Sequence, residues 1–165
     1  MKVPRLVVPM TCAVLAASVS SYRVAAAQTV LASGDHESGA KVELLSVKRD
    51  SPTVVTVSWR YRNDSAEPKQ LTHDRTGWID PYRLSVESYL LDETNQVKFP
   101  VARDAKNKPV ASRNGEPNKF ITIGPKAAVI VWAKYLVPVS TKTVSVVIDG
   151  LAPLGGIKVP DTPGA

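Results

Sequence analysis

Each of the two histidines in this 165-residue chain lies beside acidic residues, which makes both of them candidates for chemistry. In the tripeptide Asp35-His36-Glu37, imidazole and carboxylate groups are side chains that bind divalent metal ions. Adjacent residues converge on one ion only where the backbone bends sharply, and metal sites usually draw their ligands from several elements. We therefore predict no metal site, and we interpret this tripeptide as part of a solvated N-terminal arm.

The second histidine, His73, is followed by Asp74 in a long polar segment over 63–82. A histidine next to a carboxylate can act as a general base, but nucleophilic catalysis also needs a convergent nucleophile, and the chain has no G-x-S-x-G signature. We therefore predict no catalytic residue and no cofactor. As an alternative function, His73, Asp74, Trp78 and Tyr82 form a hypothetical ligand-binding group. In a simpler interpretation, Trp78 only tethers the long loop to the end of the domain.

Basic side chains gather between residues 98 and 119. This segment contains six basic residues and only two acidic ones, which gives a local charge of +4. The basic residues are Lys98, Arg103, Lys106, Lys108, Arg113 and Lys119, and the acidic residues are Asp104 and Glu116. We predict that Arg103, Lys106, Lys108 and Arg113 contact an anionic surface through screened Coulomb attraction. Nucleic acid is not predicted as a partner, because no aromatic residue lies among the cations of 103–119. The alternative interpretation is a soluble turn region whose lysines discourage edge-to-edge pairing of strands.

The first 27 residues have the organisation of a secretory signal peptide. Lys2 and Arg5 precede an apolar run that is short for a membrane span, and Ala25 and Ala27 supply small side chains before a cleavage site after residue 27. An uncleaved membrane anchor is the alternative, and it is less well supported. The only cysteine, Cys12, lies in this segment. Cleavage would leave a chain without cysteine, with 18 basic residues against 15 acidic ones instead of 21 against 15.

The rest of the chain has the pattern of short strands separated by turns. The clearest run, from 53 to 62, alternates buried-type residues (Val55, Val57, Trp59 and Tyr61) with polar ones, which is the period of a strand with one buried face. We predict no helix and about seven strands. The strands are expected over 42–47, 53–62, 83–91, 97–102, 120–123, 127–136 and 143–148. This pattern predicts an all-β antiparallel sandwich over 41–150, with a flexible arm at 28–40 and a Pro/Gly-rich tail at 151–165.

Several segments carry a resemblance to known domains: 42–47, 53–64 (with VSWRYRNDS over 57–65), 89–92, 99–104, 123–126 and 129–136. In this order they resemble secreted bacterial immunoglobulin-like domains, which occur alone or attached to OmpA-like envelope proteins. The resemblance implies an immunoglobulin-like β-sandwich that serves binding or an accessory role in the envelope, and it brings no catalytic residues. The 63–82 segment is longer than the corresponding connection in those domains.

These observations predict an exported, non-enzymatic binding or accessory domain of the bacterial cell envelope, periplasmic or secreted, with no stable membrane span after cleavage. The predicted partner is an envelope protein or an anionic envelope polymer. The alternative is a metal- or ligand-binding domain, or less plausibly a hydrolase, built on the 63–82 loop.

Overall fold

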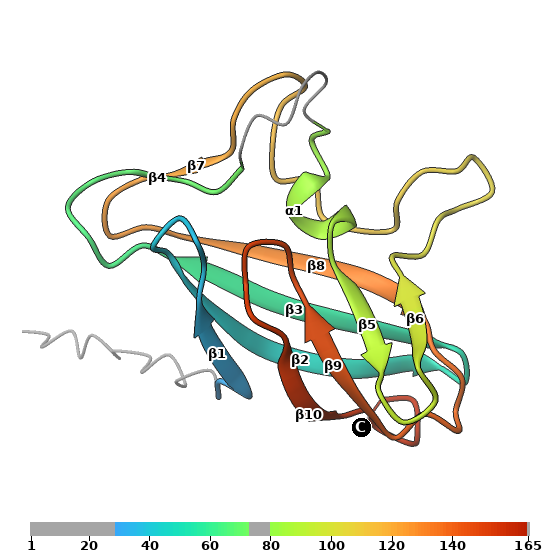
Figure 1. Ribbon diagram of the computed structural model, residues 1–165. Coiled ribbons are helices and arrows are strands. Elements are labelled where there is room, and N and C mark those ends of the chain that lie inside the picture. The colour runs from blue at the N-terminus through green and yellow to red at the C-terminus, as the bar shows by residue number, and fades with distance from the viewer. Residues whose placement is uncertain (1–28, 73–79, 165) are drawn as a thin grey trace, which may run out of the picture.

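The computed structural model describes residues 29–72 and 80–164. Two four-stranded antiparallel sheets pack face to face around one apolar core (Figure 1). The predicted all-β antiparallel sandwich is therefore confirmed. The predicted signal peptide, at 1–27, lies outside the described residues. Within the described residues, no helix is long and apolar enough to span a bilayer.

The first sheet has the strand order β1-β2-β3-β8. Its strands are β1 (Ala32–Asp35), β2 (Lys41–Ser51), β3 (Val54–Arg62) and β8 (Ala128–Leu136). The inward face of β3 is Val55, Val57, Trp59 and Tyr61, none more than 1% exposed, as the alternation predicts. Trp132 on β8 points away from this core and is 37% exposed.

The second sheet has the strand order β10-β9-β5-β6 and covers the inner face of the first. Its strands are β5 (Tyr89–Asp92), β6 (Val97–Pro100), β9 (Thr143–Val147) and β10 (Leu154–Lys158). A short pair, β4 (Lys69–Gln70) with β7 (Thr122–Ile123), stands at one end of the sandwich. The chain therefore alternates between sheets: β2 and β3 in the first, β5 and β6 in the second, β8 back in the first, and β9 and β10 in the second.

The strand predicted over 83–91 is wrong in its first half, where the chain forms the short helix α1 (Arg83–Val86) and enters β5 only at Tyr89. Local hydrogen bonds explain the difference. The Asp80 carboxylate accepts the Tyr82 amide at 2.8 Å, and the Ser85 hydroxyl donates to the Tyr82 carbonyl at 2.8 Å. Side chains that bond to nearby backbone in this way offer the chain an alternative to a strand ladder.

The N-terminal residues also differ from the expected flexible arm. Strand β1 pairs with β2 from Ala32 opposite Leu44 to Asp35 opposite Lys41, and a turn over 36–40 joins the two strands. Edge strands need little apolar alternation, so the polar composition of this segment concealed it. Likewise, β10 forms within the predicted tail, with an irregular register between Leu154 and Ile157.

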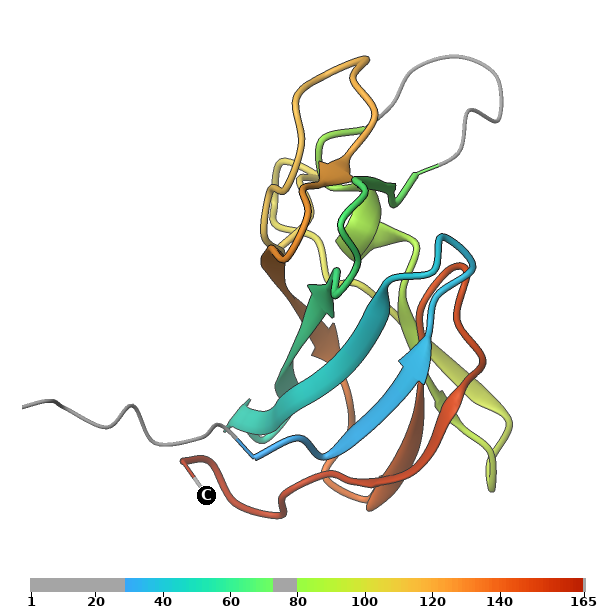
Figure 2. The same ribbon diagram turned by 90° about the vertical axis from the view of Figure 1, so that its left-hand side faces the viewer.

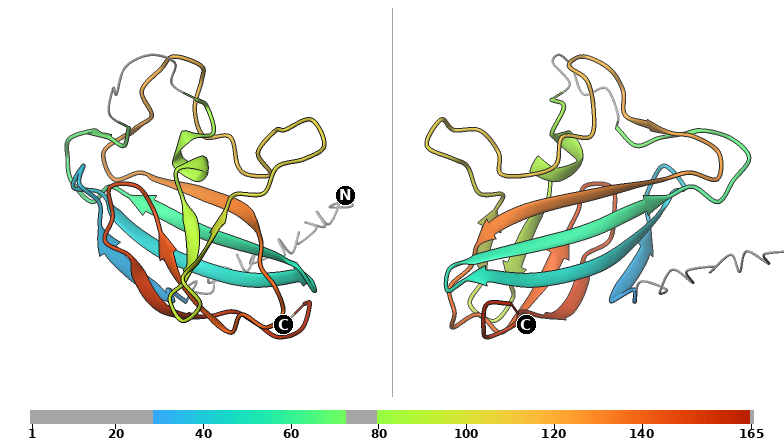
Figure 3. Two further views of the ribbon diagram at one scale, coloured as in Figure 1. Left: turned by 45° about the vertical axis from the view of Figure 1, so that its right-hand side comes forward. Right: turned by 180° about the vertical axis from the view of Figure 1, so that it is seen from behind.

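The 101–114 segment covers the free edge of β8. The amide of Ala102 donates to the carbonyl of Lys134, the amide of Lys134 donates to the carbonyl of Val110, and the amide of Ser112 donates to the carbonyl of Trp132. Between these contacts, residues 103–109 leave the sheet edge as a loop that projects from the sandwich (Figure 3). The fold thus fixes both ends of the segment that carries the predicted basic contact residues.

Asn63 anchors the beginning of the long connection after β3. The residue is fully buried, and its side-chain amide donates to the carbonyls of Glu67 at 2.8 Å and Gly124 at 3.0 Å. Further along, the amide of Leu71 donates to the carbonyl of Ile121. Residues 63–72 are therefore held against the segment that leads into β8.

Candidate functional site

The loop at 103–109 is organised around the carboxylate of Asp104. One of its oxygens accepts the backbone amides of Lys106 at 2.9 Å and Lys108 at 2.8 Å, and the Asp104 amide donates to the Lys108 carbonyl at 2.9 Å. The Arg103 guanidinium donates to the carbonyl of Asn107 at 2.8 Å. The only acidic residue of this loop therefore accepts hydrogen bonds from loop backbone, while the lysine side chains stay exposed.

The four predicted contact residues, Arg103, Lys106, Lys108 and Arg113, are all exposed. Within residues 29–72 and 80–164, none of them forms an ion pair with an acidic side chain. The ammonium of Lys108 lies 5.8 Å from the centre of the Tyr82 ring, which places that cation beside α1. These cations are free to attract an anion from solution.

The other two basic residues of 98–119 are engaged elsewhere. Lys119 forms an ion pair with Glu116, three residues before it. The ammonium of Lys98 lies 3.7 Å from the centre of the Tyr89 ring. The region that carries the excess positive charge is therefore smaller than the sequence indicates. It consists of the 103–109 loop and Arg113.

The ligand-binding group predicted on the 63–82 loop cannot be assembled from the structure. His73, Asp74 and Trp78 lie outside the described residues, so this group stays a prediction. Tyr82 is half-buried at the beginning of α1, and its ring neighbours Lys108. The described part of the loop therefore adds one aromatic residue to the basic site.

His36 lies in the turn between β1 and β2 and is only 4% exposed, although we expected a solvated arm. Its ring is edge-on to Tyr61, with 5.5 Å between the ring centres, and its Nδ1 accepts the Ser38 amide at 3.1 Å. The neighbouring Asp35 and Glu37 are exposed, so the three side chains do not share one environment. Among the residues that the structure describes, no group of three or more His, Cys, Asp or Glu residues could hold a metal ion.

A second group of charged side chains lies near the C-terminal end of α1. Arg83 donates from Nε to a carboxylate oxygen of Glu87 at 3.0 Å, and Asp149 approaches from the turn after β9. Burial raises the pKa of Glu87; the hydrogen bond from Arg83 opposes this shift, and the negative charge of Asp149 adds to it. Neither Glu87 nor Asp149 belongs to a sequence motif, and they come from separate elements, so no pattern in the sequence predicted this group.

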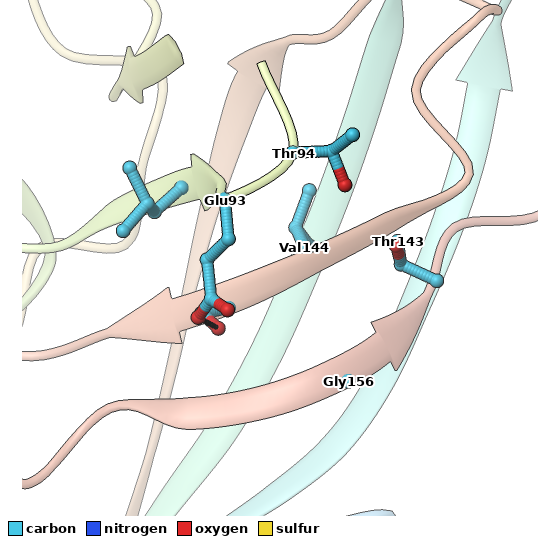
Figure 4. A pocket seen from close by; sticks show the side chains of 7 residues that line it. Glu93, Thr94, Thr143, Val144 and Gly156 are labelled. Atoms are coloured by element: carbon cyan, nitrogen blue, oxygen red, sulfur yellow. Dashed lines mark hydrogen bonds between the residues drawn. The ribbon is translucent and has the colours of Figure 1, made fainter. Parts of the chain in front are cut away.

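A small hollow lies on the outer face of the second sheet, where β5, β9 and β10 adjoin (Figure 4). Its volume is about 110 Å³, and its polar lining includes Glu93, Thr94, Thr143 and Ser145. The Ser145 hydroxyl donates a hydrogen bond to the Glu93 carboxylate. Because this volume is well below the roughly 300 Å³ of small ligand pockets, we assign no ligand to the hollow.

Comparisons with protein-family models, with curated proteins and with solved structures found no significant match for this chain.

Proposed function

We propose that this protein is an exported, non-enzymatic binding domain of the bacterial cell envelope that contacts an anionic envelope polymer. The observation that carries the proposal is the 103–109 loop, which its own hydrogen bonds order and which presents to solvent Lys106 and Lys108, exposed and without an ion pair among the described residues. Cations on an ordered projecting loop interact with several negative groups of a polymer at once, and the loop loses less backbone freedom on binding than a mobile tail would.

An immunoglobulin-like topology is part of this proposal. The facing strand orders β1-β2-β3-β8 and β10-β9-β5-β6, with crossings between the sheets after β3, β6 and β8, support it. In such sandwiches the connecting loops cluster at the ends and carry binding residues on a rigid scaffold. The 103–109 loop, α1 and the 112–120 connection gather at one end of this sandwich (Figure 1).

Export is tested by the N-terminus of the protein recovered from the host that makes it. We expect the recovered chain to begin at Gln28, because Ala25 and Ala27 are the small side chains that signal peptidase requires before the cut. The measurement is intact mass together with N-terminal sequencing of the periplasmic and medium fractions. A full-length chain retained in the cytoplasm would contradict both the cleavage and the proposed location.

Polymer binding is tested with fluorescently labelled polyphosphate as the probe, followed by fluorescence anisotropy. We expect the double variant Lys106→Gln/Lys108→Gln to bind about 10-fold more weakly than the unmodified protein at low salt, since two cations leave the contact. We also expect the affinity of the unmodified protein to fall as salt is raised, because the attraction is screened.

The matched control is Lys48→Gln/Lys158→Gln, which removes the same charge from exposed positions on β2 and β10. This control should bind polyphosphate nearly as well as the unmodified protein. Equal losses in the two double variants would mean that only net charge matters, and the proposed site would then be wrong.

A further inference from the structure

A second hollow, of about 270 Å³, opens between the end of α1, the first residue of β5, the end of β6 and the turn after β9. Its lining combines two acidic side chains with an aromatic ring, a lysine and apolar groups: Glu87, Asp149, Tyr89, Lys98, Val86 and Pro100. The elements that form it lie side by side in Figures 1 and 3, and the paired strands β5 and β6 position Tyr89, Lys98 and Pro100. This volume approaches the lower end of the range for ligand pockets, and it suits one small group rather than a large molecule.

Glu87 and Asp149 bring two carboxyl groups to this hollow from separate elements. The guanidinium of Arg83 donates to Glu87, and Arg83, Glu87 and Asp149 also line a smaller hollow beside His36 and Tyr61. Within the part of the chain that the structure describes, no ion pair joins Lys98 to Glu87 or Asp149. Of the two carboxyl groups at this hollow, Glu87 is therefore already paired with Arg83, and among the described residues neither is paired with Lys98.

Tyr89 supplies an aromatic face that already holds an ammonium group. The Lys98 ammonium is 3.7 Å from the ring centre, well inside the range of about 6 Å over which a cation is attracted to an aromatic face. Lys98 is exposed, and its flexible stem allows the ammonium to swing out into water. The protein's own lysine thus shows which chemical group fits against this ring.

We propose that this hollow is a binding site for an alkylammonium group, which enters in place of Lys98. The ligand ammonium would lie over the Tyr89 ring, where the Lys98 ammonium now lies, and the carboxyl groups of Glu87 and Asp149 in the same hollow would attract it. A divalent metal is a poorer fit, because the described residues provide no cluster of three or more ligands. The site is separate from the basic loop and does not depend on the proposed polymer binding.

Two probes distinguish the sources of such a group: n-pentylammonium represents a free amine, and the peptide acetyl-Ala-Lys-Ala-amide represents a protein lysine. Binding is followed by NMR titration of the backbone amides of Val86, Tyr89 and Asp149. We expect saturable shifts with at least one probe, and no shifts with pentanol or with the matched norleucine peptide. Glu87→Gln should weaken binding about 10-fold, as expected when a charge partner is removed from a partly enclosed site.

The decisive variant is Lys98→Met, which keeps the apolar stem and removes the competing ammonium. It should strengthen binding several-fold, which a merely structural role for Lys98 would not produce. Glu67→Gln, an exposed acid in the connection after β3, serves as the control and should leave binding unchanged. Shifts that fail to saturate, an unaltered affinity in Glu87→Gln, or weaker binding in Lys98→Met would each overturn the proposal.

Discussion

Replacing Arg49 by alanine is expected to lower the free energy of unfolding by about 4 kcal/mol, a large share of the 5–15 kcal/mol typical of a domain. Arg49 is 1% exposed on β2. Its guanidinium donates to the carbonyls of Pro160 at 2.7 Å, Pro52 at 2.9 Å, Val137 at 3.0 Å and Pro138 at 3.4 Å. Alanine would leave a cavity and several buried carbonyl groups without their donor.

The measurement is urea unfolding of Arg49→Ala beside two comparison variants. Lys48→Ala changes the exposed neighbour on the same strand and should cost less than about 0.5 kcal/mol. Arg49→Lys keeps the charge but cannot reproduce the planar fork of donors, so it should fall between the other two. A cost for Arg49→Ala as small as that for Lys48→Ala would show that the carbonyl groups find other donors.

Arg49 also shows what sequence reasoning could not reach in this fold. It lies between Lys48 and Asp50, in a run that has the appearance of a solvated turn. It is buried because carbonyl groups from 52, 137–138 and 160 converge on it, and residue types do not encode such a convergence. By contrast, β3 was predictable because one buried face imposes a strict alternation on its residues.

The candidate site, like the fold, was only partly predictable from the sequence. Charge counting found Arg103, Lys106, Lys108 and Arg113, because a cluster of like charges is visible in a linear sequence. Counting could not show that Lys119 is already paired or that Lys98 lies on an aromatic ring, since those contacts depend on geometry. Glu87 and Asp149 meet only through the folding of α1 against the turn after β9.

That turn supports the second large stability effect, at Gly150. Its φ of +72° lies in the left-handed region that favours glycine. The Gly150 carbonyl accepts the Glu37 amide at 2.8 Å, which joins the turns over 36–40 and 148–151 that lie side by side in Figure 2. A Cβ at Gly150 would lie 2.6 Å from His36 Nε2 and 2.9 Å from the Cγ of Glu37. Such an overlap requires the nearly buried His36 ring and the Glu37 side chain, or one of the two turns, to move.

We therefore expect Gly150→Ala to cost about 3 kcal/mol, the sum of left-handed backbone strain and overpacking against a nearly buried imidazole. Gly156→Ala isolates the first contribution, because its φ of +68° is nearly the same and nothing lies within 4 Å of its added Cβ. That variant should cost about 1 kcal/mol in the same urea unfolding measurement. Hydrogen exchange at the Glu37 amide should accelerate in Gly150→Ala alone, since only that variant moves the acceptor. If the two alanine variants lowered the free energy of unfolding equally, the His36 ring would move aside with little loss of stability. The contact between the two turns would then contribute little to stability.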